Sequence, residues 1–457
     1  MMHDMRHETD SLGAMDLPRT CLWGIHTQRA IDNFPISGLT LSHFPEFIRS
    51  LAWVKKACAR ANLSLGVLSA EKARVIEEVC DEIIAGRWHD AFRVDMIQGG
   101  AGTSTNMNAN EVIANLGLLK MGYKPGDYAH LHPNDDVNRS QSTNDVYPTA
   151  LRLAMVSQCD AFSAAQRRLI ARFKERADAF AHIRKIGRTQ LQDAVPMTLG
   201  QEFAGFATTI AEDVEIIGRL SNLLLEVNLG GTAIGTRVNT PSGYAEVAVA
   251  ELAQVSGLNA KLASDLIEAS SDTGAYVTFS GVLKRIAVKL SKICNDLRLL
   301  SSGPRSGFNE IHLPAAQAGS SIMPGKINPV IPEVVNQVAF QVIGNDLTVT
   351  MAAEGGQLQL NAFEPVIVLN VLQSMRILMQ AMDTLAERCV KGIEANVAQC
   401  EGMLENSLVL ATMLVPHIGY EKAAKVAKTA LAENAAVAET AVKLGFATAE
   451  TIDAMLR

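Results

Sequence analysis

Two stripes of apolar residues with helical spacing dominate the second half of the chain. Apolar residues recur there at alternating intervals of three and four: Leu283, Ile286, Leu290, Ile293, Leu297 and Leu300 in the first stripe, and Val368, Val371, Met375, Leu378, Met382, Leu385 and Cys389 in the second. Long helices in a bundle present such a seam to one another. No strand-like alternation of any length competes with this pattern. We predict long packed helices whose stripes form core and carry no chemistry.

Proline positions support the same prediction. Six prolines punctuate the first third of the chain, whereas only two interrupt the stretch between Pro148 and Pro304. Because proline breaks helix interiors, the longest helices are expected in that middle stretch. The alanine-rich stretch from about 419 to 457 predicts a small terminal helical unit.

Composition places the chain among globular proteins and excludes several classes. Of its 457 residues, 48% are hydrophobic and 19% charged, so a large core forms without a disulfide or metal. Seven scattered cysteines without a CxxC pair indicate reduced intracellular thiols. The N-terminus has no apolar leader, and no run reaches the ~18 apolar residues of a membrane span. A net charge of −7, with both signs interspersed, argues against a nucleic-acid-binding surface. We expect a cytoplasmic protein with no membrane or nucleic-acid partner.

The segment 319–329, GSSIMPGKINP, departs most from its apolar surroundings. Its glycines and prolines exclude a helix or a central strand, so we predict a loop. Hydroxyls, amides and one cation in a loop suit an anionic substrate whose charge shifts during reaction. A phosphate-binding loop is excluded, because five residues separate Gly319 from Gly325-Lys326 and Ile327 stands where Ser or Thr is required. An ordinary surface turn is the alternative.

Three further segments are unusually polar and glycine-rich. They are GGAGTSTNMNAN at 99–110, HPNDDVNRSQSTN at 132–144 and GRTQLQD at 187–193, the last followed by a helix predicted to begin near Pro196. Taken singly, each fits a helix cap or a turn, because Ser, Thr and Asn are the residues that helix starts use. Segment 319–329 shares this polar, glycine-rich composition.

All four segments, in this order and spacing, resemble conserved blocks of the aspartase/fumarase superfamily, whose members cleave C–N or C–O bonds and release fumarate. The resemblance continues through SKICNDLRLLSSGPRSGFNEI, PEVVNQVAFQVIGND and AAEGGQLQLNAFEP, and it covers the start, DSLGAMDLPRTCLWGIHTQRAIDNFPISG. Nearly the whole chain takes part. The nearest resemblance is to the members that release ammonia from L-aspartate.

The resemblance implies a mainly all-α chain of three domains. They are an N-terminal domain at 1–144, a central bundle of long helices at 145–398 that carries the loop 319–329, and a small C-terminal helical domain at 399–457. It also implies a homotetramer with a shared helical core, in which three subunits contribute to each active site. The expected partner is a small dicarboxylate such as L-aspartate or fumarate.

The site residues that the resemblance implies follow the matched blocks. Ser320 matches the general base. Lys326 and Asn328 match contacts to the α-carboxylate, and Asn144 matches a contact to the amino group. The remaining matches are the residues around the β-carboxylate and its neighbours: Thr103, Ser142, Thr143, Thr189, Gln190 and the backbone amide of Ser321.

These residue types suit removal of a proton next to a carboxylate. The resulting aci-carboxylate concentrates two negative charges on one group, and hydroxyl and N–H donors aimed at its oxygens stabilise it. A serine acts as a base only where nearby donors or cations stabilise its alkoxide. Glycines at 319 and 325 allow loop amides to converge on Ser320, and Lys326 supplies a cation.

Position 190 separates two branches of the superfamily. Fumarases have the pattern GRTHLQD, whereas this chain has Gln190. A hydroxyl must be protonated to leave as water, so a hydratase benefits from a nearby acid. The ammonium group of aspartate leaves without one. The absence of histidine therefore favours ammonia release, although some aspartases resemble fumarases at this position.

Two positions depart from the family pattern. Asp136 stands where histidine is common, and Arg237 stands where a glycine is usual. A glycine at 237 serves close packing or a positive φ, so an arginine is expected either to crowd the pocket or to add an anion contact.

Three alternatives to aspartate deamination remain at this stage. They are fumarate hydration, another fumarate-releasing C–N or C–O cleavage, and a catalytically retired structural protein with the same fold. Argininosuccinate and adenylosuccinate fit less well. No organic cofactor is expected, and no metal site is predicted, because HExxH, CxxC and Asp/Asn-rich calcium loops are absent from the sequence. Modulation by a divalent cation fits some family members, but no ligand set can be named.

Overall fold

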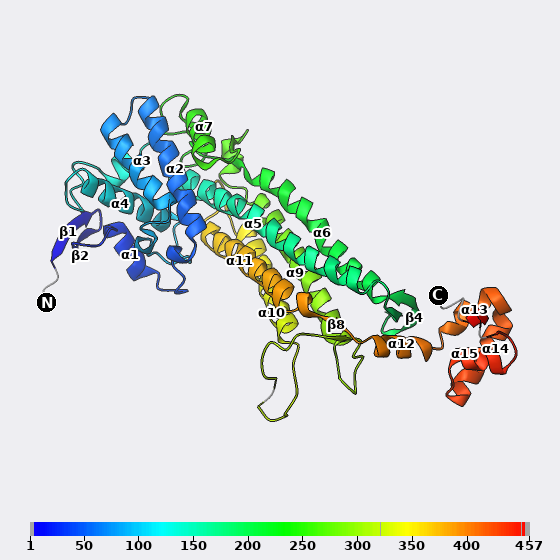
Figure 1. Ribbon diagram of the computed structural model, residues 1–457. Coiled ribbons are helices and arrows are strands. Elements are labelled where there is room, and N and C mark those ends of the chain that lie inside the picture. Colours follow the sequence, from blue (N-terminus) through cyan, green and yellow to red (C-terminus); the bar gives the residue numbers. More distant parts are fainter. Residues whose placement is uncertain (1–3, 320, 449, 453–457) are drawn as a thin grey trace. The chain divides into compact units, whose positions relative to one another are not determined.

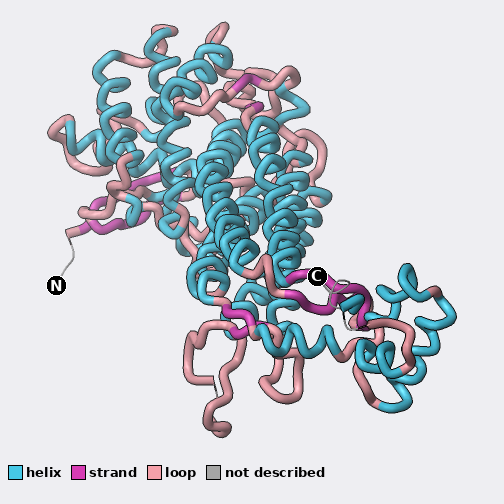
Figure 2. The backbone as a smooth tube through the Cα atoms, turned by 45° about the vertical axis from the view of Figure 1, so that its right-hand side comes forward, coloured by secondary structure: helices cyan, strands magenta, loops and turns pink. Residues whose placement is uncertain are grey.

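The computed structural model describes residues 4–319, 321–448 and 450–452 (Figure 1). These residues are mainly helical, as predicted, and their strands form four two-stranded sheets (Figure 2). Packing divides the chain into two compact units. Unit 1 comprises 1–163, 215–285 and 340–378, and unit 2 comprises 164–214, 286–339 and 379–457. The three-domain boundaries expected from the sequence stay a prediction.

Long helices contribute to both units. They are α5 (Thr143–Ala179), α6 (Leu199–Leu224), α9 (Gly274–Leu300), α10 (Val330–Glu354) and α11 (Glu364–Arg388). The first apolar stripe lies on α9 and the second on α11, ending at Cys389 just beyond it, and every member of both stripes is buried. The helical interpretation of the periodicity is therefore confirmed.

Buried polar side chains connect the packed helices within each unit. In unit 1, the Asn345 amide of α10 donates to the Ser374 hydroxyl of α11 at 3.0 Å. In unit 2, the Asn336 amide donates to Ser291 Oγ of α9 at 2.9 Å. Because a buried amide without a partner is costly, such bonds favour one register between neighbouring helices.

Unit 1 contains most of the shorter helices. They are α1 (Ile25–Asn33), α2 (Pro45–Ser64), α3 (Ala70–Ile84), α4 (Thr103–Lys120), α7 (Tyr244–Ser256) and α8 (Leu266–Ala269), with the turns η1 (Leu41–His43), η2 (His89–Ala91) and η3 (Pro133–Val137). Its strands are β1 (Met5–Asp10) paired antiparallel with β2 (Gly13–Pro18), and β5 (Glu226–Val227) paired parallel with β6 (Lys261–Leu262).

The start of α1 is capped from a distance. The buried Glu111 carboxylate of α4 accepts hydrogen bonds from the backbone N–H of Gly24 at 2.9 Å and from the Thr27 hydroxyl at 2.6 Å. These groups lie at the N-terminus of α1, whose first N–H groups have no partner within the helix. A side chain at Gly24 would collide with Glu111, because an added Cβ would lie 2.8 Å from its carboxylate.

Unit 2 contains the hairpin of β3 (Arg184–Thr189) and β4 (Gln192–Thr198), and the pair β7 (Ile311–His312) and β8 (Glu394–Ala395). After the turn η4 (Val390–Gly392) follow α12 (Val397–Glu405), α13 (Leu410–Ile418), α14 (Tyr420–Glu433) and α15 (Val437–Lys443). The last helices share a core that includes Leu414, Val426 and Ala441, as the alanine-rich sequence predicts.

The prediction that a helix begins near Pro196 is wrong in its starting residue. Pro196 lies in β4 opposite Ile186, and α6 begins only at Leu199. A proline is tolerated in this strand because a two-stranded sheet consists of edges only.

One described helical segment, Glu364–Gly392, is long and apolar enough to cross a membrane. Most of it, 67% of the apolar window, is buried by the rest of the protein. Its buried stripe identifies it as a core helix of the bundle.

Candidate active site

Residues 142–144 form the start of α5, and a buried carboxylate holds them in place. Asp145 accepts the backbone N–H of Ser142 at 3.0 Å, and it also accepts those of Gly230 and Thr232 at 3.0 and 2.9 Å. Burial raises the pKa of Asp145 to about 6, while these three N–H donors oppose the rise. One side chain thus ties the Ser142–Asn144 segment to the loop after β5.

Further bonds strengthen this connection. The Asn144 amide donates to the Ala233 carbonyl at 2.8 Å, and the Asn228 amide donates to the Asn144 carbonyl at 3.0 Å. Because its N–H₂ group faces Ala233, Asn144 keeps its amide oxygen for another donor.

Between these two segments lies a cavity of about 390 Å³. Its lining combines two predicted site residues with others that sequence reasoning missed: Ser142 and Thr143, with Asn138, Ser140, Gln141, Thr232, Ala233, Val238 and Asn239. The family match had already indicated Ser142 and Thr143. Thr232, Ala233, Val238 and Asn239 were not singled out, because the sequence around them is marked only by glycines at 230, 231 and 235 and by Arg237.

Thr103 begins α4, and its hydroxyl donates to the Gly100 carbonyl at 2.7 Å. It does not line the cavity. One turn later, the Asn106 amide donates to Thr143 Oγ1 at 3.1 Å. The starts of α4 and α5 are therefore directly connected, and the first two polar segments meet as predicted.

Lys55 of α2 lies beneath this junction and was missed by sequence reasoning. It is fully buried, and its ammonium donates to the amide oxygens of Asn106, Asn138 and Gln141 at 2.7, 2.9 and 2.8 Å. Burial lowers the pKa of Lys55 to about 8. A buried lysine surrounded by amide oxygens, next to the cavity, marks a polar network rather than plain core.

In unit 2, Thr189 and Gln190 lie at the exposed end of the β3–β4 hairpin. The connecting residues Gln190 and Leu191 have φ of 53° and 60°. This two-residue turn normally uses Asn or Gly, because other side chains are disfavoured at positive φ. Backbone strain of this kind is typical of functional segments.

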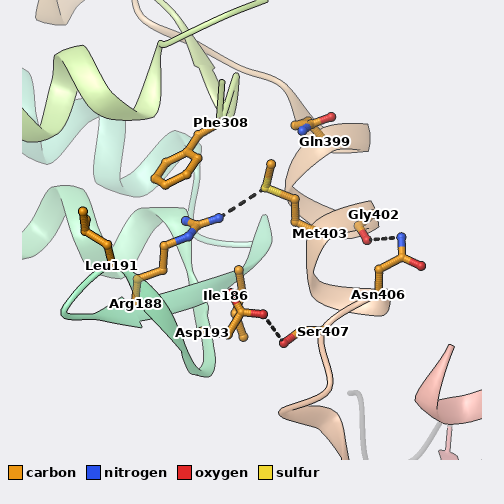
Figure 3. Close-up of a pocket in the computed structure, with 10 residues that line it drawn as sticks. All are labelled: Ile186, Arg188, Leu191, Asp193, Phe308, Gln399, Gly402, Met403, Asn406 and Ser407. Atoms are coloured by element: carbon orange, nitrogen blue, oxygen red, sulfur yellow. Dashed lines mark hydrogen bonds between the residues drawn. The ribbon is translucent and has the colours of Figure 1, made fainter. Parts of the chain in front are cut away.

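A second cavity of about 530 Å³ lies beside this hairpin (Figure 3). Arg188 extends into it between the Phe308 ring, whose centroid is 4.2 Å from the guanidinium carbon, and the Met403 sulfur, 3.2 Å from the guanidinium. The same guanidinium pairs with the buried Glu310 at 2.7 Å. Ser407 donates to Asp193 at 2.7 Å. These contacts attach the hairpin to α12 and the residues after it.

The loop 319–329 has no helix or strand among its described residues, as predicted. Ser320 lies outside the described residues. The Asn328 amide donates to the Gly319 carbonyl at 2.7 Å, and only glycine fits at 319, because an added Cβ would lie 1.7 Å from the Lys326 carbonyl oxygen. Ser321 and Lys326 are exposed. The loop is closed at its base and presents its polar residues outward.

The two departures from the family pattern have structural partners. Arg237 has a φ of 61°, which explains why glycine is usual there, and its side chain pairs with Glu246 at 2.7 Å. It does not line the 390 Å³ cavity, so it does not crowd it. The expected anion contact stays a prediction. Asp136 pairs with Lys72 at 2.6 Å and accepts the His132 N–H at 2.8 Å.

The predicted residues fall into two groups. Thr103, Ser142, Thr143 and Asn144 belong to unit 1, whereas Thr189, Gln190, Ser321, Lys326 and Asn328 belong to unit 2. Within the part of the chain that the structure describes, no three His, Cys, Asp or Glu side chains are grouped to hold a metal ion. The expectation that no cofactor is needed stays a prediction.

Two family models match the chain. Residues 13–344 match the Lyase family model, and residues 410–457 match the model for the fumarase C C-terminus.

Several relatives named aspartate ammonia-lyase resemble the chain over almost its full length. The relative from Pseudomonas canavaninivorans is 57% identical, covering 99% of this chain and 96% of its own. The relative from Helicobacter pylori strain 26695 is 54% identical, with coverages of 98% and 96%. That from Escherichia coli K12 is 53% identical, with coverages of 99% and 95%.

Solved structures agree with the fold. A fumarate lyase:delta crystallin from Brucella melitensis, bound to cobalt, has a TM-score of 0.97 and 60% identity, covering 99% of this chain and 98% of its own. A class II fumarase from Schistosoma mansoni has a TM-score of 0.92 at 34% identity, covering 99% and 98%.

Proposed function

The chain belongs to the aspartase/fumarase superfamily of lyases, and on that basis we propose that it deaminates L-aspartate reversibly to fumarate and ammonia. One observation carries the proposal. The chain is 53% to 57% identical to ammonia-lyases from three bacterial genera over nearly its whole length, but only 34% identical to a fumarase of the same fold. The protein is accordingly a carbon–nitrogen lyase.

Gln190 supports ammonia as the leaving group. An amide side chain cannot protonate a departing hydroxyl, which a hydratase requires. The ammonium group of aspartate is already protonated and leaves as neutral ammonia with the electron pair of the Cα–N bond. No acid is therefore needed at position 190.

Substrate binding follows from the donors in and around the 390 Å³ cavity. Ser142 and Thr143 line it, and their hydroxyls are proposed to bind the β-carboxylate together with Thr189 and the Ser321 amide. Thr103 is proposed to join them by exchanging its bond to the Gly100 carbonyl for one to the substrate. Asn144 offers its amide oxygen, since its N–H₂ group is taken by Ala233. An amide oxygen suits the substrate ammonium.

The chemistry is proposed to begin at Ser320. Its alkoxide takes the Cβ proton, and the electron pair of the C–H bond moves into the β-carboxylate to form the aci-carboxylate. When this intermediate collapses, the Cα–N bond breaks and fumarate remains. Lys326 and Asn328 are proposed to hold the α-carboxylate, and no cofactor takes part in any step.

The proposed assembly is a homotetramer in which three subunits share each site. Its support is an uncovered apolar face on α10. Phe340, Leu347 and Met351 are 63%, 61% and 66% exposed, and Asp346, the one charged residue between Glu333 and Glu354, is buried against Ser280. A helix that is apolar on its outer face is normally covered, and second copies of the chain are the proposed cover.

Replacing Leu347 with aspartate is expected to break this assembly. A charge at a central position of an apolar interface has no partner, so the mass measured by light scattering should fall from a tetramer to smaller species. The Leu347→Met variant keeps the apolar contact and should remain tetrameric. If Leu347→Asp stays tetrameric, this face of α10 does not form the interface.

Localisation in the cytoplasm is part of the proposal. All seven cysteines are free and buried, which fits a reducing compartment.

The function is tested by following the ultraviolet absorbance of fumarate's conjugated double bond. Purified protein is mixed with L-aspartate in one cuvette and with L-malate in another. We expect absorbance to rise with aspartate alone. A rise with malate alone would identify a hydratase, and no rise with either would favour another amine substrate or a structural protein.

A further inference from the structure

Lys55 determines the orientation of three side-chain amides. An ammonium group has three hydrogens to donate and no lone pair to accept with. All three of its hydrogens have acceptors, at 2.7 to 2.9 Å, in Asn106, Asn138 and Gln141. Each amide must therefore turn its oxygen toward Lys55 and its N–H₂ group away from it.

For Asn106 this orientation has a direct consequence. Its N–H₂ group faces Thr143 Oγ1 at 3.1 Å and also Asn138 Oδ1 at 3.1 Å. The oxygen of Thr143 therefore accepts a hydrogen from Asn106. Its own hydroxyl hydrogen has to point elsewhere.

Thr143 lines the 390 Å³ cavity. Among the residues that the structure describes, no acceptor for its hydroxyl hydrogen is found. A hydroxyl that accepts from the protein and donates into a cavity is suited to an anion, because a carboxylate can only accept.

We propose that Lys55 is a positioning residue which acts through Asn106 to fix the Thr143 hydroxyl as a hydrogen-bond donor to the substrate carboxylate. This inference rests on the proposed function and adds to it how the donor direction is set. Without Lys55, the Asn106 amide could turn around and present its oxygen to Thr143. The threonine would then donate to the protein and present a lone pair to the carboxylate.

The test reverses the polarity of Asn106 without changing its shape. In Asn106→Asp the new carboxylate still accepts from Lys55, and it gains an ion pair. It cannot donate to Thr143, so the threonine hydroxyl turns toward it. We expect the dissociation constant for succinate, a dicarboxylate that cannot react, to rise about tenfold to a hundredfold, as for loss of a hydrogen bond to a charged group. The new ion pair with Lys55 offsets the lost hydrogen bond to Asn138 Oδ1, so the melting temperature should change little.

Asn108 provides a matched control on the same helix. It is also buried, but its amide bonds only to backbone groups. It accepts from the Arg93 N–H at 2.9 Å and donates to the Ala91 carbonyl at 3.1 Å. Asn108→Asp should lower the melting temperature and leave succinate affinity unchanged. Asn106→Asp is thus expected to weaken succinate binding with little change in melting temperature, whereas Asn108→Asp is expected to lower the melting temperature without weakening binding.

A double-mutant cycle separates the relay from a general disturbance. In a Thr143→Val background, Asn106→Asp should weaken succinate binding less than about twofold, because the hydroxyl it redirects is gone. An undiminished effect in that background would overturn the proposal, as would unchanged binding in Asn106→Asp alone. If Asn106→Asp does not fold, Lys55→Gln is carried through the same cycle with the same expectations.

Failure of the relay differs from failure of the proposed function. If wild-type protein neither binds succinate nor converts aspartate, the proposed function is wrong. If wild-type protein does both and the cycle is additive, only the relay is wrong.

Discussion

Ser320→Ala is expected to lower kcat for L-aspartate by about 10³-fold or more, which lies within the range that a positioned general base contributes. Alanine has no oxygen to receive the Cβ proton, and no neighbouring residue is expected to replace it. The hydrogen bond that closes the base of the loop joins the Asn328 amide to the Gly319 carbonyl and does not involve the serine side chain. Succinate affinity, melting temperature and mass should therefore remain close to wild type.

This combination of results distinguishes a base from a structural residue. A structural role would lower succinate affinity or melting temperature together with turnover. An active Ser320→Ala protein would contradict the base assignment and leave the loop as a binding element only.

The helical core could be predicted because its signal is local. The stripes on α9 and α11 repeat within single helices, and burial of one face requires that period. The β3–β4 hairpin was not predicted, because its strands carry Arg188, Thr189, Gln192 and Asp193 among their residues and show no apolar alternation. Its stability comes from contacts with distant residues such as Glu310 and Ser407.

The site was predicted unevenly for a similar reason. Lys55 and Lys56 are adjacent in sequence, yet Lys55 is buried among amides and Lys56 pairs with Asp81 at 2.6 Å. No local pattern tells which of two neighbouring lysines faces inward. Thr232 and Asn239 join the cavity through the loop after β5, more than 85 positions after Thr143 in the sequence. Only the fold brings these residues together.

Mixing two inactive variants should restore activity if three subunits share each site. One variant carries Ser320→Ala in the loop 319–329, and the other carries Thr143→Val at the start of α5. Each alone should fall to about 1% of wild type or less, since losing one donor to the developing charge costs about a hundredfold. After random subunit exchange, about a quarter of the sites should combine an intact loop with an intact α5 start from other subunits.

The measured quantity is kcat per site in purified mixed tetramers. A matched control mixes Ser320→Ala with Lys326→Met. Both lesions then lie in the same loop, so no loop in the mixture is intact and activity should stay at parental levels. We expect kcat to recover to about a quarter of wild type in the mixture with Thr143→Val and not to recover in the control. That result requires that the loop and the α5 start at one site come from different chains. If the first mixture is no more active than its parents, each site is built within one chain, and the uncovered face of α10 serves assembly without serving catalysis.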